Sequence, residues 1–195
     1  MGEKAEGRAQ APVTGKEAVI EAIMEAATEL FAQKAPSQVS VREIAAHADV
    51  NHGLIHRHFG SKKNLIAEVI QANDAKLSEV LDGESSFMEN FVNVAVMAFQ
   101  DRRYVRIPAN LVIDGQQELL IEHQGTLFET LRASFEQLIS EEQRQRLSVD
   151  ERMFLLATLG FGIEMFGDYV AASMQIERPD TMELAQKLIP LANDV

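Results

Sequence analysis

The sequence predicts an all-α protein of about nine helices. Apolar residues recur at spacings of three and four along most of the chain, which is the periodicity of helices with one buried face. The Ser/Thr-x-x-Glu segments that begin at Thr14, Ser40 and Ser148 have the spacing of a helical capping box. No segment of sufficient length alternates apolar and polar residues as a half-buried strand does. The 195 residues suffice for one large domain or two small ones.

The N-terminal segment is predicted to be a disordered tail followed by one amphipathic helix. Residues 1–13 are small, polar and charged, and such a composition does not supply a packed core. Thr14 and Glu17 have the capping-box spacing, and apolar residues recur at helical intervals beyond them. Because Pro36 stops the pattern, the first helix is expected over residues 14–33.

Two short helices and a long one are expected next. Ser40 and Glu43 form the second capping-box pattern, which predicts a helix over residues 40–48. A further short helix is expected over residues 51–59, up to a Gly-Ser break. Amphipathic periodicity then predicts a long helix over residues 62–81.

The rest of the chain is predicted to contain five more helices. Their expected ranges are 86–100, from 104 or 108 to 114, 116–140, 148–174 and 180–192. The third capping-box pattern, Ser148 to Glu151, marks the start of one of them.

The composition excludes several classes of protein. The chain has no cysteine, so it forms no disulfide or thiolate metal site, and a cytoplasmic location is expected. No apolar run approaches the roughly 18 residues of a membrane span, and the N-terminal residues lack the apolar stretch of a signal peptide. We find no Gly-rich phosphate loop and no nucleophile paired with a base, so neither an enzyme nor a cofactor is expected.

The histidines do not form a recognisable metal site. His52 and His56 are four residues apart on one face of a predicted helix, a geometry that occurs in zinc sites. No glutamate lies between them in a His-Glu-x-x-His frame, and no third ligand is apparent. We therefore expect no metal, and we expect His47 and His58 to be surface or partly packed residues.

The charge is divided unevenly along the chain. Residues 1–63 contain 8 Lys and Arg against 8 Asp and Glu, whereas residues 64–195 contain 10 basic against 22 acidic residues and carry the whole net charge of −12. An acidic C-terminal part would repel DNA and thereby orient a neutral N-terminal part toward it. Solubility alone is an equally good reason for an acidic surface.

The segment of residues 41–70 reads VREIAAHADVNHGLIHRHFGSKKNLIAEVI. It resembles the N-terminal domain of the TetR family of bacterial repressors, and the resemblance extends over residues 17–70. The apolar residues at the spacings expected for the family are Phe31, Val41, Ile44, Ala45, Val50, Ile55, Phe59 and Leu65. The resemblance implies a helix-turn-helix DNA-binding domain over residues 14–61 and an effector-binding and dimerisation domain over residues 62–195.

The resemblance also implies which residues contact operator DNA. In the family, the third helix lies in the major groove with its first residues facing base edges, and its end and the start of the fourth helix meet phosphates. The implied base-reading residues are Asn51, His52 and Leu54, which offer an amide, an imidazole and an apolar contact for a thymine methyl. The implied phosphate contacts are Ser40, Arg42, His56, Arg57 and Lys62. For Arg42 and Arg57, an ordinary solvated charge is the alternative.

The segment departs from the family pattern in the turn and in the third helix. Asp49 stands where glycine is usual, which predicts an aspartate in the left-handed conformation. His56 and His58 replace residues that are commonly tyrosine. A histidine can still donate to phosphate and becomes cationic below about pH 6.5. We therefore hypothesise that DNA affinity rises as the pH falls.

A homodimer is implied for the C-terminal part, because the last two long helices of each subunit form a four-helix interface in the family. The helix expected over residues 148–174 carries a stripe of small residues with apolar residues around it. The expected interface residues are Ala157, Gly160, Ile163, Gly167, Val170, Ala171, Leu184 and Leu188. Packing of the small stripe within one chain is the alternative.

An effector pocket is expected inside the same domain, lined by apolar residues of three helices. They are Phe87, Phe91, Val94, Met97, Phe128, Leu131, Phe135, Phe154, Phe161 and Met165, and they favour a hydrophobic or aromatic ligand. Core packing is the alternative for most of them. Glu164, Asp168, Arg102, Arg103 and Arg106 are candidate polar anchors for a ligand; a solvated face or an interface ion pair is the alternative for each.

These observations predict a DNA-binding transcriptional regulator with an inverted-repeat operator and a small-molecule effector of unknown identity. The effector would favour a dimer whose recognition helices no longer match successive major grooves, so a repressor would be released. The alternative is a ligand-binding or protein-interaction module of the same fold that has lost sequence-specific DNA binding.

Overall fold

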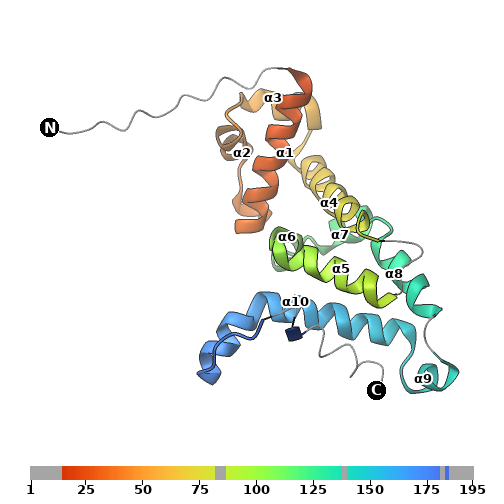
Figure 1. Cartoon of the computed structure of the whole chain (residues 1–195). Helices are drawn as coiled ribbons and strands as arrows, with labels where there is room; N and C mark the ends of the chain where they lie inside the picture. Colours follow the sequence, from red (N-terminus) through yellow and green to blue (C-terminus); the bar gives the residue numbers. More distant parts are fainter. Residues whose placement is uncertain (1–14, 82–86, 138–139, 181–182, 185–195) are drawn as a thin grey trace.

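The computed structural model describes residues 15–81, 87–137, 140–180 and 183–184. Over these residues the chain forms ten α-helices, one short 3₁₀ helix and no strand, which confirms the all-α prediction (Figure 1). The predicted tail at residues 1–13 and most of the predicted last helix lie outside the described residues.

Three helices and a 3₁₀ turn form the N-terminal unit, which we call the head. They are α1 (Lys16–Gln33), η1 (Pro36–Gln38), α2 (Val41–His47) and α3 (His52–Phe59). Phe31, Ile44 and Ile55 are almost wholly buried at their centre, as the apolar spacing predicted. Leu65 joins them from the start of the next helix, α4 (Lys62–Ser78).

The helix starts agree with the capping patterns in two of three cases. Ser40 and Ser148 each accept a hydrogen bond from the backbone N–H three residues on, and the glutamate at that position bonds back to the serine N–H. The predicted box at Thr14 and Glu17 is wrong, because α1 begins at Lys16 and its N-cap is a glycine without a side-chain bond.

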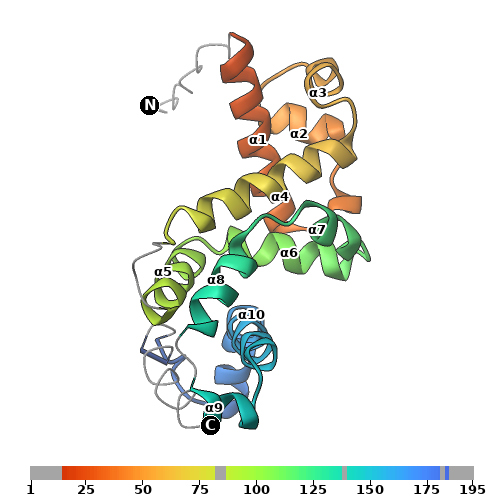
Figure 2. The ribbon, with the colours of Figure 1, turned by 90° about the vertical axis from the view of Figure 1, so that its right-hand side faces the viewer.

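The helices after α4 lie on the side of the molecule away from α2 and α3 (Figure 2). They are α5 (Phe87–Gln100), α6 (Arg103–Ile113), α7 (Gln117–His123), α8 (Leu127–Glu136), α9 (Glu141–Arg146) and α10 (Val149–Met174). Of all helix pairs, α1 and α6 make the most extensive contact. Ile107, Leu111 and Leu119 bury themselves against the head, so one apolar core continues from the head into α6 and α7.

The single helix predicted over residues 116–140 is wrong: α7 and α8 are separate helices with a break at residues 124–126. Gly125 lies in this break against α4, where a Cβ atom would stand only 2.0 Å from a carboxylate oxygen of Asp74. The close approach of the two segments leaves no room for a Cβ atom, which explains the glycine at this position. Periodicity within residues 116–140 did not reveal the break because its cause lies in α4.

The longest helix, α10, lies at the opposite end of the molecule from the head (Figures 1 and 2). It packs on α6 and α8, yet most of its large apolar side chains remain exposed. Among the described helices it is the one that is long and apolar enough to cross a membrane, judged by length and composition alone. This corrects the expectation that no apolar run approaches that length.

Candidate nucleic-acid interface

The first turn of α3 presents polar groups at the surface of the head. Asn51, His52 and Gly53 are exposed, whereas Ile55 on the opposite face of α3 is fully buried in the core. The side of α3 that carries the expected base-reading residues is therefore turned to solvent, apart from Leu54. Leu54 is half-buried and packs against the core of the head, so only part of its side chain is available to a base.

Asn51 has a structural role that the sequence reasoning missed. It is the N-cap of α3, and its Oδ1 atom accepts a hydrogen bond from the Gly53 N–H at 2.8 Å. A Cβ atom at position 53 would lie 3.2 Å from the same oxygen, so glycine leaves room for the cap. The amide Nδ2 group of Asn51 remains to donate to a base edge.

Exposed cations also occur on α2 and α3. Arg42 on α2 and Arg57 on α3 are exposed, and neither forms an ion pair with any residue that the structure describes. His56 is also exposed, with its Nδ1 atom 3.3 Å from the Gly60 carbonyl oxygen. Because a carbonyl only accepts, Nδ1 carries the proton in this contact, and Nε2 faces away from it.

Ser40 and the other histidines have partners within the head. The Ser40 hydroxyl accepts the capping bond from the Glu43 N–H at 3.1 Å, and its proton remains available to a phosphate. His47 pairs with Glu29 at 2.5 Å and is exposed, while His58 is half-buried, as expected for both. Asp49 has a φ of 52°, which confirms the left-handed conformation predicted for the turn.

Lys62 lies where the head meets the rest of the chain. Its Nζ atom donates to the Pro36 carbonyl oxygen, and the side chain is half-buried. Burial lowers the pKa of Lys62, and the nearby carboxylates of Asp114 and Glu43 act in the opposite direction. In this structure the lysine expected to contact phosphate is thus bound to the head itself.

Polar contacts from α6 also fasten the head, and the sequence reasoning did not foresee them. Asn110 donates through Nδ2 to the Phe31 carbonyl at 2.8 Å, at the end of α1. Asp114 accepts a 2.8 Å bond from the Ser37 N–H and a second bond from the Ser37 hydroxyl, which hold the pKa of Asp114 below its ordinary value. These partners are more than 70 residues apart in sequence, so no local pattern could indicate them.

The residues expected at the dimer interface differ in burial and in what lies beside them. Gly167 and Ala171 face the chain's own following segment: a Cβ atom at Gly167 would lie 3.3 Å from the Arg178 guanidinium, and Ala171 is buried. Gly160 has open space beside it, and Val170 is exposed. Ala157 and Ile163 are half-buried, as is Leu184, whereas Leu188 lies outside the described residues.

An open apolar groove of about 590 Å³ runs along α10 and the segment that follows it. Leu155, Leu159 and Val170 line it from α10, and Ile176 and Leu184 line it from that segment. The large apolar side chains left exposed on α10 are Phe154, Leu155, Leu159, Phe161, Phe166, Tyr169, Val170 and Met174.

The residues expected to line an effector pocket differ in their burial. Leu131 and Val94 belong to a small apolar cluster with α10, and Met97 and Met165 are half-buried. Phe128, Phe154 and Phe161 are exposed instead, with Phe154 lining the groove on α10. The side chains of Phe87, Phe91 and Phe135 lie outside the described residues.

Glu164, Asp168, Arg102 and Arg103 form ion pairs, which was the alternative to a role as polar anchors for a ligand. Glu164 is buried and pairs with Arg102 at the start of α6 and with Arg178 at 3.4 Å. Asp168 pairs with Arg178 at 2.7 Å and with Arg102 at 3.5 Å, and the hydrogen bond from Arg178 lowers its pKa. Arg103 pairs with Glu25 of α1 at 2.6 Å, so α6 is tied to both ends of the molecule.

Residues 23–69 match the profile of a family described as bacterial regulatory proteins, tetR family. An HTH-type transcriptional repressor of Mycobacterium tuberculosis is 39% identical over 102 residues, which make up 52% of this chain and 50% of that protein. The chain thus spans about half the length of the curated relatives that it matches.

Two solved structures are similar over most of the chain. A TetR-family transcriptional regulator from Streptomyces coelicolor superposes with a TM-score of 0.63 at 16% identity, covering 90% of this chain and 79% of that one. The secondary repressor of the MexAB-OprM multidrug efflux pump in Pseudomonas aeruginosa gives a TM-score of 0.60 at 22% identity, covering 91% and 96%. At these identities the similarity shows the fold alone.

Proposed function

We propose that the chain is a DNA-binding transcriptional regulator of the TetR family, because residues 23–69 match that family's profile and the chain is similar to a mycobacterial HTH-type repressor. It would act as a repressor that a small effector releases from an inverted-repeat operator. The proposal includes a cytoplasmic location, because a protein that binds an operator has to reach the chromosome. The similarity to a named repressor supports repression rather than activation.

The observation that carries DNA binding is the exposed first turn of α3, together with the exposed Arg42 and Arg57, which form no ion pair within the described residues. Asn51 and His52 offer donors and acceptors of the kind that read base edges in the major groove. Arg42 and Arg57 have no carboxylate partner in the described part of the chain and are therefore available to phosphates. Asn51, His52 and part of Leu54 are proposed to read bases; Ser40, Arg42, His56, Arg57 and Lys62 are proposed to contact phosphate.

The exposed apolar face of α10 supports a homodimer. Isolated exposed apolar side chains are common, but a continuous row of large ones along one helix marks an interaction surface. A second copy of the same face would cover it across a two-fold axis. The buried carboxylate of Glu164 argues against a membrane around α10, because its partners Arg102 and Arg178 come from other segments of the folded chain.

We propose that the effector is a small apolar or aromatic molecule that binds in the domain formed by α5 to α10. Two of the expected pocket residues, Leu131 and Val94, pack in one apolar cluster, and a ligand that binds between them would have to separate their side chains. The alternative function, a ligand-binding or protein-interaction module without operator binding, draws on the net charge of −12.

The direct test is selection of bound duplexes from a random pool at near-physiological salt, followed by a salt titration on the selected sequence. Recovery of an inverted repeat with half-sites about one helical turn apart would support a dimeric regulator. Arg42→Ala and Arg57→Ala should each weaken binding to every sequence and lower the salt slope by about 1. Arg106→Ala, an exposed arginine of α6, is the matched control and should change neither.

Absence of any enriched sequence, in protein shown to be folded and dimeric, would favour the module without operator binding. The dimer is tested separately by sedimentation. Phe166→Glu should yield monomers because it places a charge on the apolar face of α10, whereas Ile121→Glu, at an equally exposed position on α7, should leave the dimer intact. A dimer that survives Phe166→Glu would contradict the proposed interface.

A further inference from the structure

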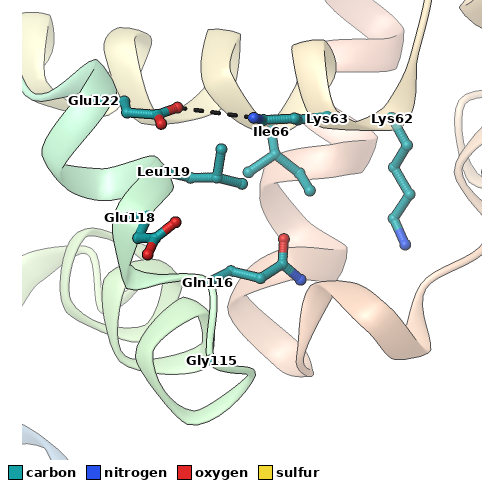
Figure 3. A pocket seen from close by; sticks show the side chains of 8 residues that line it. All are labelled: Lys62, Lys63, Ile66, Gly115, Gln116, Glu118, Leu119 and Glu122. Carbon is teal, nitrogen blue, oxygen red and sulfur yellow. Dashed lines mark ion pairs between the residues drawn. The ribbon is translucent and has the colours of Figure 1, made fainter.

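A cavity of about 360 Å³ lies at the junction between the head and the rest of the chain (Figure 3). It is bounded by the start of α4, by α7 and by the turn at Gly115 that joins α6 to α7. None of the residues expected to line an effector pocket belongs to it. The cavity is therefore separate from the residues expected to line an effector pocket, and it shares Lys62 with the proposed phosphate contacts.

The centre of the cavity is apolar. Ile66 of α4 and Leu119 of α7 approach one another between the two helices, and each is only a few per cent exposed (Figure 3). The exposed edges of these two side chains can accept a small aliphatic group, because a ligand methyl group there leaves water for an apolar environment.

Four charged side chains surround this centre, and two of them form an ion pair with each other. Lys63 and Glu122 form an ion pair at 3.8 Å. Lys62 and Glu118 form no ion pair with any described residue, and Figure 3 shows them on opposite sides of the apolar centre. Lys62 uses one of its three ammonium hydrogens on the Pro36 carbonyl, so donors remain for a ligand.

One ammonium and one carboxylate without ionic partners, on either side of an apolar centre, match a ligand that carries both charges. We propose that the cavity binds a small amphoteric molecule, an amino acid or short peptide with an aliphatic side chain. Lys62 holds its carboxylate, Glu118 holds its ammonium group, and its side chain rests on Ile66 and Leu119.

Binding would also affect DNA, and this consequence rests on the proposed function. Lys62 is one of the expected phosphate contacts, and a ligand carboxylate competes for the same ammonium group. The ligand also bridges α4 and α7 beside the Asp114–Ser37 contact that fastens the head. An occupied cavity therefore lowers operator affinity by a route separate from the proposed effector region.

The test measures binding without DNA, so its result does not depend on the proposed function. Full-length protein labelled with ¹³C at isoleucine and leucine methyl groups is titrated with L-leucine, glycyl-L-leucine and 6-aminohexanoate, which span increasing charge separations. At least one should shift the methyl signals of Ile66 and Leu119. If none shifts them at about 10 mM, tenfold above a weak Kd of about 1 mM, the proposal is wrong.

Blocked ligands and variants test the two charges separately. N-acetyl-L-leucine and L-leucinamide each lack one charge, and each should bind about tenfold or more weakly than L-leucine if L-leucine is the ligand. Glu118→Gln should weaken binding to a similar extent, whereas Glu129→Gln, an exposed glutamate of α8 outside the cavity, should not. Unchanged affinity in Glu118→Gln, with a native methyl spectrum, would overturn the assignment of the ammonium site.

Discussion

Asn51 offers a prediction that separates folding of the head from recognition of DNA. Its side chain caps α3 through the 2.8 Å bond to the Gly53 N–H, and the same side chain is proposed to face a base. Asn51→Ala removes both roles. Loss of an N-cap costs about 1 kcal/mol, which corresponds to a fall in Tm of about 2–4 °C for a chain of this size. Because α3 has only eight residues, we expect much of the effect as faster opening of its own amides.

Two substitutions that preserve the cap complete the experiment. Asn51→Asp keeps an oxygen for the Gly53 N–H and places a negative charge at a helix N-terminus, so stability should be equal or higher. The same charge would face the DNA phosphates, so operator affinity should fall below that of Asn51→Ala. Asn51→Ser should keep the cap and change sequence preference.

The assays are thermal unfolding with hydrogen exchange of α3, and fluorescence anisotropy with the selected duplex at fixed salt. The reasoning requires the order of the alanine and aspartate variants to reverse between stability and DNA affinity. If Asn51→Ala unfolds at the wild-type temperature with unchanged α3 exchange, the cap does not stabilise the helix. If Asn51→Asp binds DNA as tightly as wild type, the first turn of α3 is not at the interface.

Three further predictions concern the proposed phosphate contacts and the bond that fastens the head to α6. Lys62→Met should weaken binding to all DNA sequences and reduce the salt slope by about 1, and an unchanged slope would remove Lys62 from the phosphate contacts. The hydrogen bonds from Ser37 lower the pKa of Asp114, so their contribution to the free energy of unfolding is present above the ordinary pKa of 3.8 and is lost as the pH falls through the lower pKa of the folded state. Asp114→Asn should therefore be less stable than wild type near pH 7. In urea unfolding, this difference in stability should shrink as the pH drops below 3.8. DNA affinity should rise as the pH falls from about 8 to about 6, and His56→Ala should abolish the rise, whereas a flat wild-type titration would exclude the histidine contact.

The parts of the fold that the sequence predicts are those determined by near neighbours. The Ser40 and Ser148 caps join atoms three residues apart, and the core of the head follows from helical spacing. The break at Gly125 was missed because its cause is Asp74, a residue of α4 that only the tertiary fold brings close. The additional role of Asn51 was missed for another reason: a residue between two short helices can cap one and read DNA, and composition does not distinguish these roles.

The sequence also could not predict which side of α10 is buried. Its apolar residues were assigned partly to a pocket and partly to an interface, because periodicity cannot say which side of a helix another segment covers. Phe154 and Phe161 are exposed, while Gly167 accommodates the chain's own Arg178 and Ala171 is buried. Part of the small-residue stripe thus serves packing within the chain, and the large apolar residues remain exposed.

Adjacent residues at the start of α6 connect the two ends of the molecule. Arg102 pairs with Glu164 and Asp168 of α10, and Arg103 pairs with Glu25 of α1. Further along the same helix, Asn110 and Asp114 bond to the end of α1 and to the following turn. A short helix held at both ends by charged and polar contacts cannot shift at one end without straining the other. If an effector moves α10 against α6, we expect the movement to reach the head through these contacts, and single substitutions that remove them should weaken the coupling.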